Sequence, residues 1–237
     1  MKKYFLSLIF IFFVSVINAQ VLKAPPRKEG EGPFTQLIIR GVTLINSTLA
    51  PPVGPVDIVV EQNRIKEVRV VGFPGVAIDS TRRPKLKPGG KELNAAGMFL
   101  LPGFVDMHGH IGGEEQGAGA EYVFKLWMAH GVTTARDPGS FNGLDWVLEE
   151  KRKSATNEIT APRLIAFTGF GAGSKEKIAT PEQARAWVRD NAAKGSDGIK
   201  FFGAAPEIMS AALEKKKSIR QFEFKKRIVV LSYFLYI

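Results

Sequence analysis

The sequence predicts an α/β protein in which a small antiparallel β-sandwich domain precedes a partial (β/α)8 barrel of the TIM type, about its first four βα units. Two observations predict this fold class. Short segments rich in β-branched residues, separated by turn residues, occupy positions 35–97. From 98 to 213, apolar strands alternate with helical segments, which is the pattern of a parallel sheet with helical crossovers.

The first 19 residues have the composition of an export signal. Lys2 and Lys3 precede an apolar stretch at 5–17, and Ala19 supplies a small residue before a cleavage site at Gln20. This stretch is shorter than a membrane-spanning helix requires, which disfavours the alternative of an uncleaved anchor. Residues 20–34 are predicted to be a linker because prolines and glycines recur there. We therefore expect an exported, periplasmic or secreted protein without membrane association after signal cleavage.

Three strands are predicted within the domain at 35–97. Residues 37–45 and 56–60 are rich in Val and Ile, and a polar turn leads from the second segment into a third strand at 65–70. Residues 72–91 are rich in Gly, Pro, Arg and Lys and are predicted to form a loop. Nothing in this domain suggests chemistry.

The half-barrel at 98–213 is predicted from its alternating elements. The strands are expected at 98–105, 132–136, 163–168 and 197–202, and the helices at 119–129, 144–153, 181–194 and 206–214. The third helix has clear end signals, with Thr180 as N-cap, Pro181 at the first position, Gln183 completing a capping box and Gly195 after the last turn. In such barrels the chemistry lies at the C-terminal ends of the strands.

Two histidines follow the first predicted barrel strand, in the stretch Pro102-Gly-Phe-Val-Asp-Met-His-Gly-His110. Residues two apart on a strand face the same way, so His108 and His110 are expected to share a face, and neutral imidazole is a common ligand for zinc. Gly109 between them lets backbone or substrate approach closely. An accidental pair is the alternative, but three histidines in 237 residues give this spacing by chance in roughly 3% of chains.

Other polar residues are placed at the same rim. Lys200 lies at the end of the fourth predicted strand, where it is either a metal ligand or a rim lysine paired with a carboxylate. Asp106 either orients one imidazole or caps the strand end. Arg136 and Asp137 close the second strand, where they contact substrate or pair with each other.

Three stretches in this order resemble the amidohydrolase superfamily, in its imidazolonepropionase-like and prolidase-like branch. They are Pro102 to His110, Gly131-Val-Thr-Thr-Ala-Arg-Asp137, and Gly198-Ile-Lys200, and the resemblance covers roughly 35–213. It implies a metal-dependent hydrolase of amide, cyclic amide or peptide-like bonds. It also implies that His108 and His110 bind a divalent metal, usually zinc, and that Lys200, as a carbamate, bridges one or two such ions.

The family pattern continues beyond what this sequence supplies. The resemblance implies two further metal-binding histidines and a catalytic aspartate on later strands, yet no histidine follows His130, so no catalytic residue is assigned in this chain. Residues 214–237 form a basic and apolar tail unlike the rest, which we interpret as a truncation, with a reading-frame slip at the lysine run as its hypothesised origin. The alternative function is therefore a catalytically inactive remnant with an incomplete metal site.

The composition of the chain limits the kinds of ligand and partner that are expected. The chain has no cysteine, which excludes disulfides and thiolate ligands. Lys2, Lys3 and the seven basic residues from Lys215 onward, less the negative charge of Glu223, account for eight of the ten net positive charges. The predicted domains are therefore nearly neutral, and nucleic acid is not expected as a partner. A small amide or peptide-like substrate is expected, and a homo-oligomer is compatible with the sequence.

Four other conspicuous residues are predicted to be structural. They are His130, at a helix end, and Trp127, Trp146 and Trp187.

Overall fold

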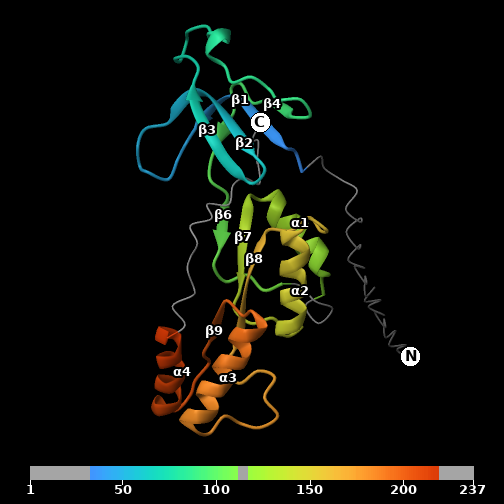
Figure 1. Ribbon diagram of the computed structural model, residues 1–237, viewed down its shortest axis with the longest axis vertical. Helices are drawn as coiled ribbons and strands as arrows, with labels where there is room; N and C mark the ends of the chain where they lie inside the picture. The colour runs from blue at the N-terminus through green and yellow to red at the C-terminus, as the bar shows by residue number, and fades with distance from the viewer. Residues whose placement is uncertain (1–32, 112–116, 219–237) are drawn as a thin grey trace, which may run out of the picture.

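The computed structural model describes residues 33–111 and 117–218, with the side chains of 215–218 left out (Figure 1). Two sheets lie one after the other along the molecule, a mixed sheet near one end and a parallel, helix-covered sheet beyond it. The predicted export signal, most of the predicted linker and nearly all of the basic tail lie outside the described residues. No helix in the described part of the chain is long and apolar enough to cross a bilayer.

The first sheet has five strands, ordered β3-β2-β1-β4, with β5 also pairing with β1. The strands are β1 (Gln36–Leu44), β2 (Val53–Glu61), β3 (Arg64–Val70), β4 (Lys91–Asn94) and β5 (Phe99–Leu100). The first three are antiparallel, as predicted, because short polar connections join them. The expectation of an antiparallel sandwich is wrong in one respect: β4 and β5 both run parallel to β1 after a long connection, so the sheet is mixed.

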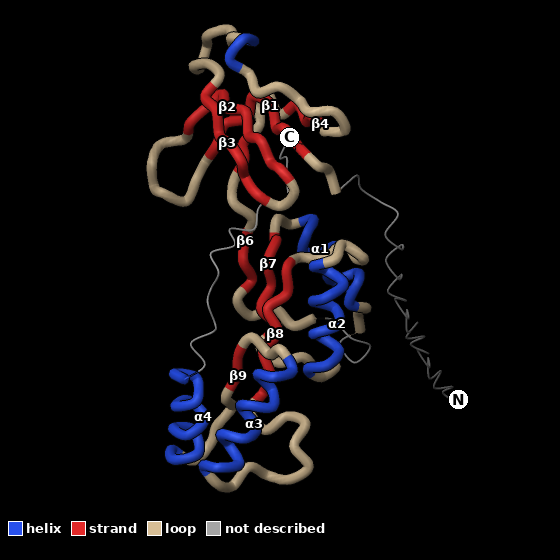
Figure 2. The backbone as a smooth tube through the Cα atoms, viewed as in Figure 1, coloured by secondary structure: helices blue, strands red, loops and turns tan. Residues whose placement is uncertain are grey.

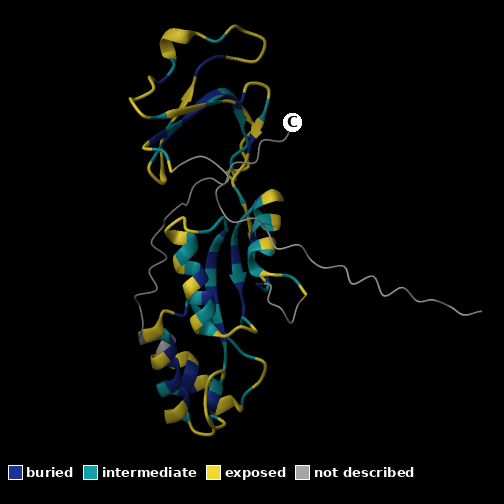
Figure 3. Ribbon diagram, turned by 90° about the vertical axis from the view of Figure 1, so that its right-hand side faces the viewer, coloured by how far each residue is buried: buried dark blue, intermediate teal, exposed yellow. Residues whose placement is uncertain are grey.

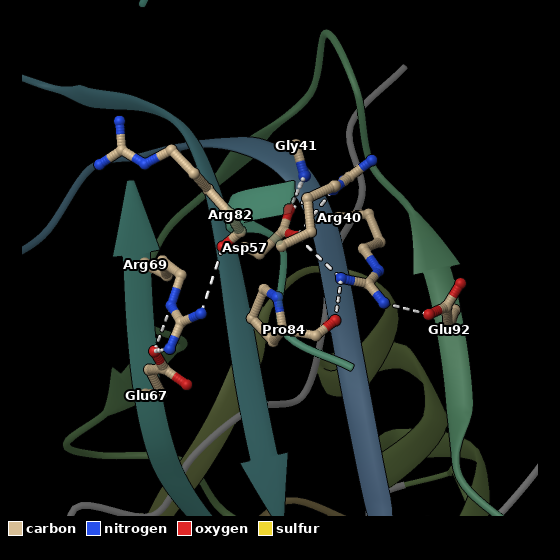
Figure 4. Close-up of polar contacts among 9 residues, drawn as sticks. Arg40, Gly41, Asp57, Glu67, Arg69, Arg82, Pro84 and Glu92 are labelled. Atoms are coloured by element: carbon tan, nitrogen blue, oxygen red, sulfur yellow. Dashed lines mark hydrogen bonds and ion pairs between the residues drawn. The ribbon is translucent and has the colours of Figure 1, made fainter. Parts of the chain in front are cut away.

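A buried carboxylate ties the long connection between β3 and β4 to the sheet (Figure 4). Asp57 on β2 is fully buried and accepts hydrogen bonds of 2.9 Å from Arg40 Nη1, from the Gly41 N–H, and from both Nε and Nη2 of Arg83. Arg40 also donates to the Pro84 carbonyl. Arg83 in the connection and Arg40 on β1 therefore compensate the negative charge of Asp57, which would be costly to bury alone.

The second sheet is parallel, with the order β6-β7-β8-β9 and helices between the strands (Figure 2). Its elements are β6 (Phe104–Asp106), α1 (Ala120–Ala129), β7 (Val132–Asp137), α2 (Leu144–Ala155), β8 (Arg163–Gly169), α3 (Pro181–Lys194), β9 (Gly198–Lys200) and α4 (Pro206–Ser218). This is the predicted succession of four βα units in a half-barrel. A short 3-10 helix, η1 (Ser80–Arg82), lies in the β3–β4 connection.

The apolar run at 98–105 is divided between the two sheets, whereas the sequence predicted one strand. Phe99 and Leu100 pair with β1, and Phe104 begins β6. Pro102 has no N–H for a strand ladder. At Gly103 a Cβ would lie 2.1 Å from the side chain of Thr133, so the chain crosses between the sheets where no side chain fits.

Local signals at the helix ends are confirmed. Thr180 and Gln183 form both bonds of the capping box, Pro181 begins α3, and Gly195 adopts a left-handed conformation after it. His130 caps the end of α1, and its ring Nδ1 lies 2.8 Å from the Leu126 carbonyl oxygen, in agreement with a structural role.

The half-barrel has two apolar cores on its helical side. Phe124, Val147 and Leu164 belong to the core beneath α1 and α2, with Trp127 and Trp146 packed against it. Trp187 belongs to the core between α3 and α4. On β6, by contrast, Phe104 and Val105 are more than half exposed, so this strand is not the buried one that the sequence predicted (Figure 3).

Candidate metal centre

Chemistry-bearing side chains meet at the C-terminal ends of three parallel strands. His108 and His110 follow β6, Asp137 ends β7, and Lys200 ends β9. Parallel strands end at the same edge of a sheet, so topology gathers residues that are up to 92 positions apart.

Lys200 and His108 lie against each other. Lys200 Nζ is 3.4 Å from His108 Nε2, and it also lies 4.7 Å from the centre of the Phe202 ring. An amine nitrogen and an imidazole nitrogen at this separation can both contact the same proton or the same metal ion.

His110 faces a buried carboxylate. Its Nδ1 lies 3.7 Å from Asp137 Oδ1, and this nitrogen is buried without a hydrogen-bond partner among the described residues. The two imidazole rings have centroids 5.3 Å apart, with the His110 ring also 5.7 Å from the ring of Phe141. The His110 nitrogen is thus a buried polar atom that still requires a partner.

Asp137 is fully buried and held by the backbone. It accepts hydrogen bonds from the Gly139 N–H at 2.9 Å and the Ile111 N–H at 3.4 Å. Burial raises the pKa of Asp137 above its ordinary value, although these hydrogen bonds and the nearby His110 and Lys200 act in the opposite direction. A carboxylate at this position stabilises positive charge at the histidine pair.

The histidine turn is held by backbone contacts rather than by a strand. Strand β6 ends at Asp106, so the alternation expected for residues on a strand does not place His108 and His110. Asp106 Oδ1 accepts the His108 N–H at 2.9 Å, which matches the strand-capping alternative. Arg136 donates to the Met107 carbonyl and accepts the Gly109 N–H at its own carbonyl.

Gly109 is required by its surroundings. A Cβ there would lie 2.5 Å from the Trp127 ring and 3.0 Å from Asp106 Oδ2. The side chain of Trp127 therefore occupies the space that the glycine leaves, whereas backbone or substrate was expected there from the sequence.

Arg136 and Asp137 do not form the pair that the sequence left open. The Arg136 guanidinium lies 5.1 Å from the centre of the Phe167 ring, and Asp137 turns toward His110 instead. The sequence placed Asp137 at the rim as a substrate contact or a partner of Arg136, and its contact with His110 was not expected. Its signal was a carboxylate at the C-terminal end of a barrel strand, level with the histidines on the neighbouring strand.

The donor set suits part of a divalent-metal site. Two imidazoles, one of them with an orphaned buried nitrogen, and a buried carboxylate are donor types that zinc and related ions use, and the Lys200 amine lies beside them. Within the described residues, however, no group of three or more His, Cys, Asp or Glu side chains is arranged to hold an ion. The described site fits a metal incompletely.

Comparisons with known proteins agree with this fold. No family model matches the sequence. A stretch of 87 residues, 33% of this chain and 15% of the relative, is 32% identical to adenine deaminase 2 of Desulfotalea psychrophila. Solved structures match over 78% of the chain: a prolidase complexed with N-methylphosphonate-L-proline (16% identity, TM-score 0.58), an amidohydrolase (17%, 0.57) and molinate hydrolase (19%, 0.59).

The chain spans about half the length of these solved structures, 54%, 54% and 52% respectively. They are members of the amidohydrolase superfamily, and the adenine deaminase belongs to it too. The expectation from the sequence agrees with these neighbours as far as the fold: this chain has the fold of these solved structures, over about half their length.

Proposed function

We propose that this chain carries part of the divalent-metal site of a hydrolase that acts on carbon–nitrogen bonds of small amide, cyclic amide or peptide-like molecules. The observation that carries the proposal is the meeting of Lys200 Nζ and His108 Nε2, 3.4 Å apart, at the C-terminal rim of a parallel half-barrel. The names of the matched proteins, a prolidase, an amidohydrolase and an adenine deaminase, support the bond class.

The residues have distinct roles in this proposal. His108 and His110 are metal ligands, and Lys200 would be a ligand as a carbamate, which forms when its amine adds carbon dioxide and releases a proton to water. Asp137 faces His110 and compensates positive charge beside it. Bound at this rim, a divalent ion, zinc in our proposal, would lower the pKa of water and polarise the substrate carbonyl.

A second candidate is a catalytically inactive remnant. It is favoured by the absence, among residues 33–111 and 117–218, of a cluster of three His, Cys, Asp or Glu side chains that suits an ion. Structural zinc sites have four protein ligands and catalytic ones have three. For this chain by itself we therefore expect weak zinc binding and little turnover.

Calorimetric titration with zinc tests the proposed site. The full chain is expected to bind zinc weakly, and His108→Ala or His110→Ala is expected to weaken binding by roughly tenfold or more. His130→Ala is the matched control, because His130 caps a helix away from the rim. Equal binding by all four proteins would contradict the proposed site.

Hydrolysis assays separate the two candidate functions. The full chain, supplied with zinc and bicarbonate, is tested on a panel of N-acyl amino acids and dipeptides. Robust turnover that is lost in Lys200→Ala would exclude the inactive remnant. Labelling with ¹³C-bicarbonate tests the carbamate, whose carbon signal is expected in the parent chain and absent in Lys200→Ala.

We also propose that the chain is exported and that residues 1–19 are removed. The proposal depends on the basic start and the apolar stretch at 5–17. The intact mass of protein recovered after export tests it, with Gln20 expected as the first residue. Recovery of the uncleaved chain in the membrane fraction would overturn it.

A further inference from the structure

Arg136, near the end of β7, is a cation that the proposed function leaves unused. Its Nε donates to the Met107 carbonyl at 2.6 Å, and its guanidinium carbon lies 5.1 Å from the centre of the Phe167 ring. Among the residues that the structure describes, its two terminal nitrogens have no hydrogen-bond or ion-pair partner. A guanidinium has five N–H donors, so those on the terminal nitrogens remain available to a ligand.

The register of the strands places Arg136 on the same face of the sheet as Lys200. Arg136 pairs with Ile165 on β8, and Phe167 lies two residues further along that strand. Phe167 in turn pairs with Gly198, two residues before Lys200 on β9. Residues that pair side by side, or that lie two apart on one strand, share a face. The alternate positions belong to the apolar core beneath the helices, so this face is the one away from the helices.

The contact with Met107 places the guanidinium beside the candidate metal centre. Met107 directly precedes His108, whose Nε2 lies 3.4 Å from Lys200 Nζ. In the proposed function Lys200 carries a carbamate, which is negatively charged. Arg136 still supplies a positive charge on this face, because a guanidinium keeps its charge at physiological pH.

A guanidinium held in this way suits a carboxylate. Its planar fork offers parallel N–H groups to the two carboxylate oxygens, and such pairs are among the strong hydrogen bonds of proteins. The bond to Met107 and the ring of Phe167 already restrict the Arg136 side chain, so binding costs little further ordering. In an N-acyl amino acid the carboxylate and the amide nitrogen are attached to the same carbon. A carboxylate bound at Arg136 therefore keeps the amide close to the histidines.

We propose that Arg136 binds the carboxylate of the substrate with its terminal nitrogens. The substrates are then N-acyl amino acids, or peptides whose C-terminal carboxylate adjoins the amide, in preference to neutral or cyclic amides. That the bound molecule is a substrate rests on the proposed function, whereas binding of the carboxylate requires no metal.

Ligand binding by the zinc-free full chain tests this contact. The chain is freed of metal on a chelating resin and titrated with N-acetyl-L-leucine or with N-acetyl-L-leucinamide, which lacks the carboxylate, while nuclear magnetic resonance follows binding. The acid is expected to bind roughly tenfold or more tightly than the amide, because hydrogen bonds to a charged group are lost in the amide. Equal affinities for the two ligands would overturn the proposal.

Two variants assign the preference to one arginine. Arg136→Gln is expected to remove the preference, so that the acid and the amide bind equally. The amide is the internal reference, since a shifted histidine turn would weaken both ligands alike. Arg189→Gln, at an exposed position on α3, is the matched control and is expected to retain the full preference. A preference that survives in Arg136→Gln would contradict the assignment to Arg136.

Inorganic phosphate tests whether the contact selects carboxylates, because an arginine fork also binds phosphate. Phosphate is expected to bind the parent chain more weakly than N-acetyl-L-leucine does. Tighter binding of phosphate would assign a phosphate site and overturn the proposed substrate class.

Carboxylate binding and zinc binding can fail independently. Zinc bound at His108 without a preference for the acid would overturn the role of Arg136 alone. A preference for the acid without zinc binding would instead contradict the proposed metal site and leave the carboxylate contact in place.

Discussion

Asp57 shows how one buried residue can organise a loop that has no regular structure of its own. Its two oxygens accept four hydrogen bonds from Arg40, Gly41 and Arg83, and Arg83 lies in the long β3–β4 connection (Figure 4). The arrangement is stable because the positive charges of the two arginines compensate the negative charge of the carboxylate in a largely dry site. Removing one partner leaves the others uncompensated.

Asp57→Ala is expected to lower the free energy of unfolding by about 3–5 kcal/mol, the cost of leaving buried charges unpaired. Urea unfolding followed by circular dichroism measures this change. Glu67→Ala, which removes an exposed ion pair with Arg69 on the same sheet, is the control and is expected to have little effect. Equal midpoints for the two variants would contradict this role of Asp57.

The same carboxylate predicts a loss of stability in acid. Burial by itself would raise the pKa of Asp57, but hydrogen bonds from Arg83, Arg40 and the Gly41 N–H outweigh burial and hold the pKa below its ordinary value of 3.8. Because the pKa of Asp57 is lower in the folded chain than in the unfolded chain, the ionised carboxylate stabilises the folded state at pH values above the ordinary pKa. This stabilisation is lost as the pH falls through the pKa that Asp57 has in the folded chain. Unfolding free energy is therefore expected to fall below about pH 4 in the parent chain, and to fall less steeply in Asp57→Asn.

At the scale of elements, short-range signals determined what the sequence could predict. The capping box at Thr180 and Gln183 involves four consecutive residues, and it formed as expected. The division of 98–105 into β5 and β6 was not predicted, because it depends on β1 and on the side chain of Thr133, far away in the sequence. The turn that carries the histidines likewise depends on Arg136 of the next strand.

Thr180→Ala removes one side-chain acceptor of the capping box. It is expected to lower the free energy of unfolding by about 1 kcal/mol. Thr180→Ser retains the hydroxyl and is expected to restore most of this stability, as measured by chemical unfolding. A serine variant as unstable as the alanine variant would show that the cap is not responsible.

Gly109→Ala tests whether the histidine turn needs its close approach to Trp127. The added Cβ would collide with the Trp127 ring at 2.5 Å, so the turn must shift and carry His108 and His110 with it. Zinc affinity is expected to fall by roughly tenfold or more, since ligand placement is sensitive to such shifts. Gly119→Ala, where nothing lies within 4 Å, is the control and is expected to bind zinc as the parent chain does.

At the scale of the whole molecule, the half-barrel was predictable and its site only partly so. Regular alternation of strands and helices predicted four parallel βα units, and parallel strand ends predicted that Lys200 and His108 would meet. The parallel pairing of β4 and β5 with β1 was not predictable, because partner choice across a long connection leaves no local pattern. The sequence placed Asp137 at the rim but did not predict its orientation toward His110, because that orientation depends on how the strands are assembled.

The central claim, a divalent-metal site at the rim of this half-barrel, is tested most directly by X-ray diffraction from crystals of the full chain soaked in zinc, with anomalous data at the zinc edge. We expect an anomalous peak within bonding distance of His108 and His110, next to Lys200, and no such peak in His108→Ala. A peak at His130 instead, or an undiminished peak in the variant, would contradict it.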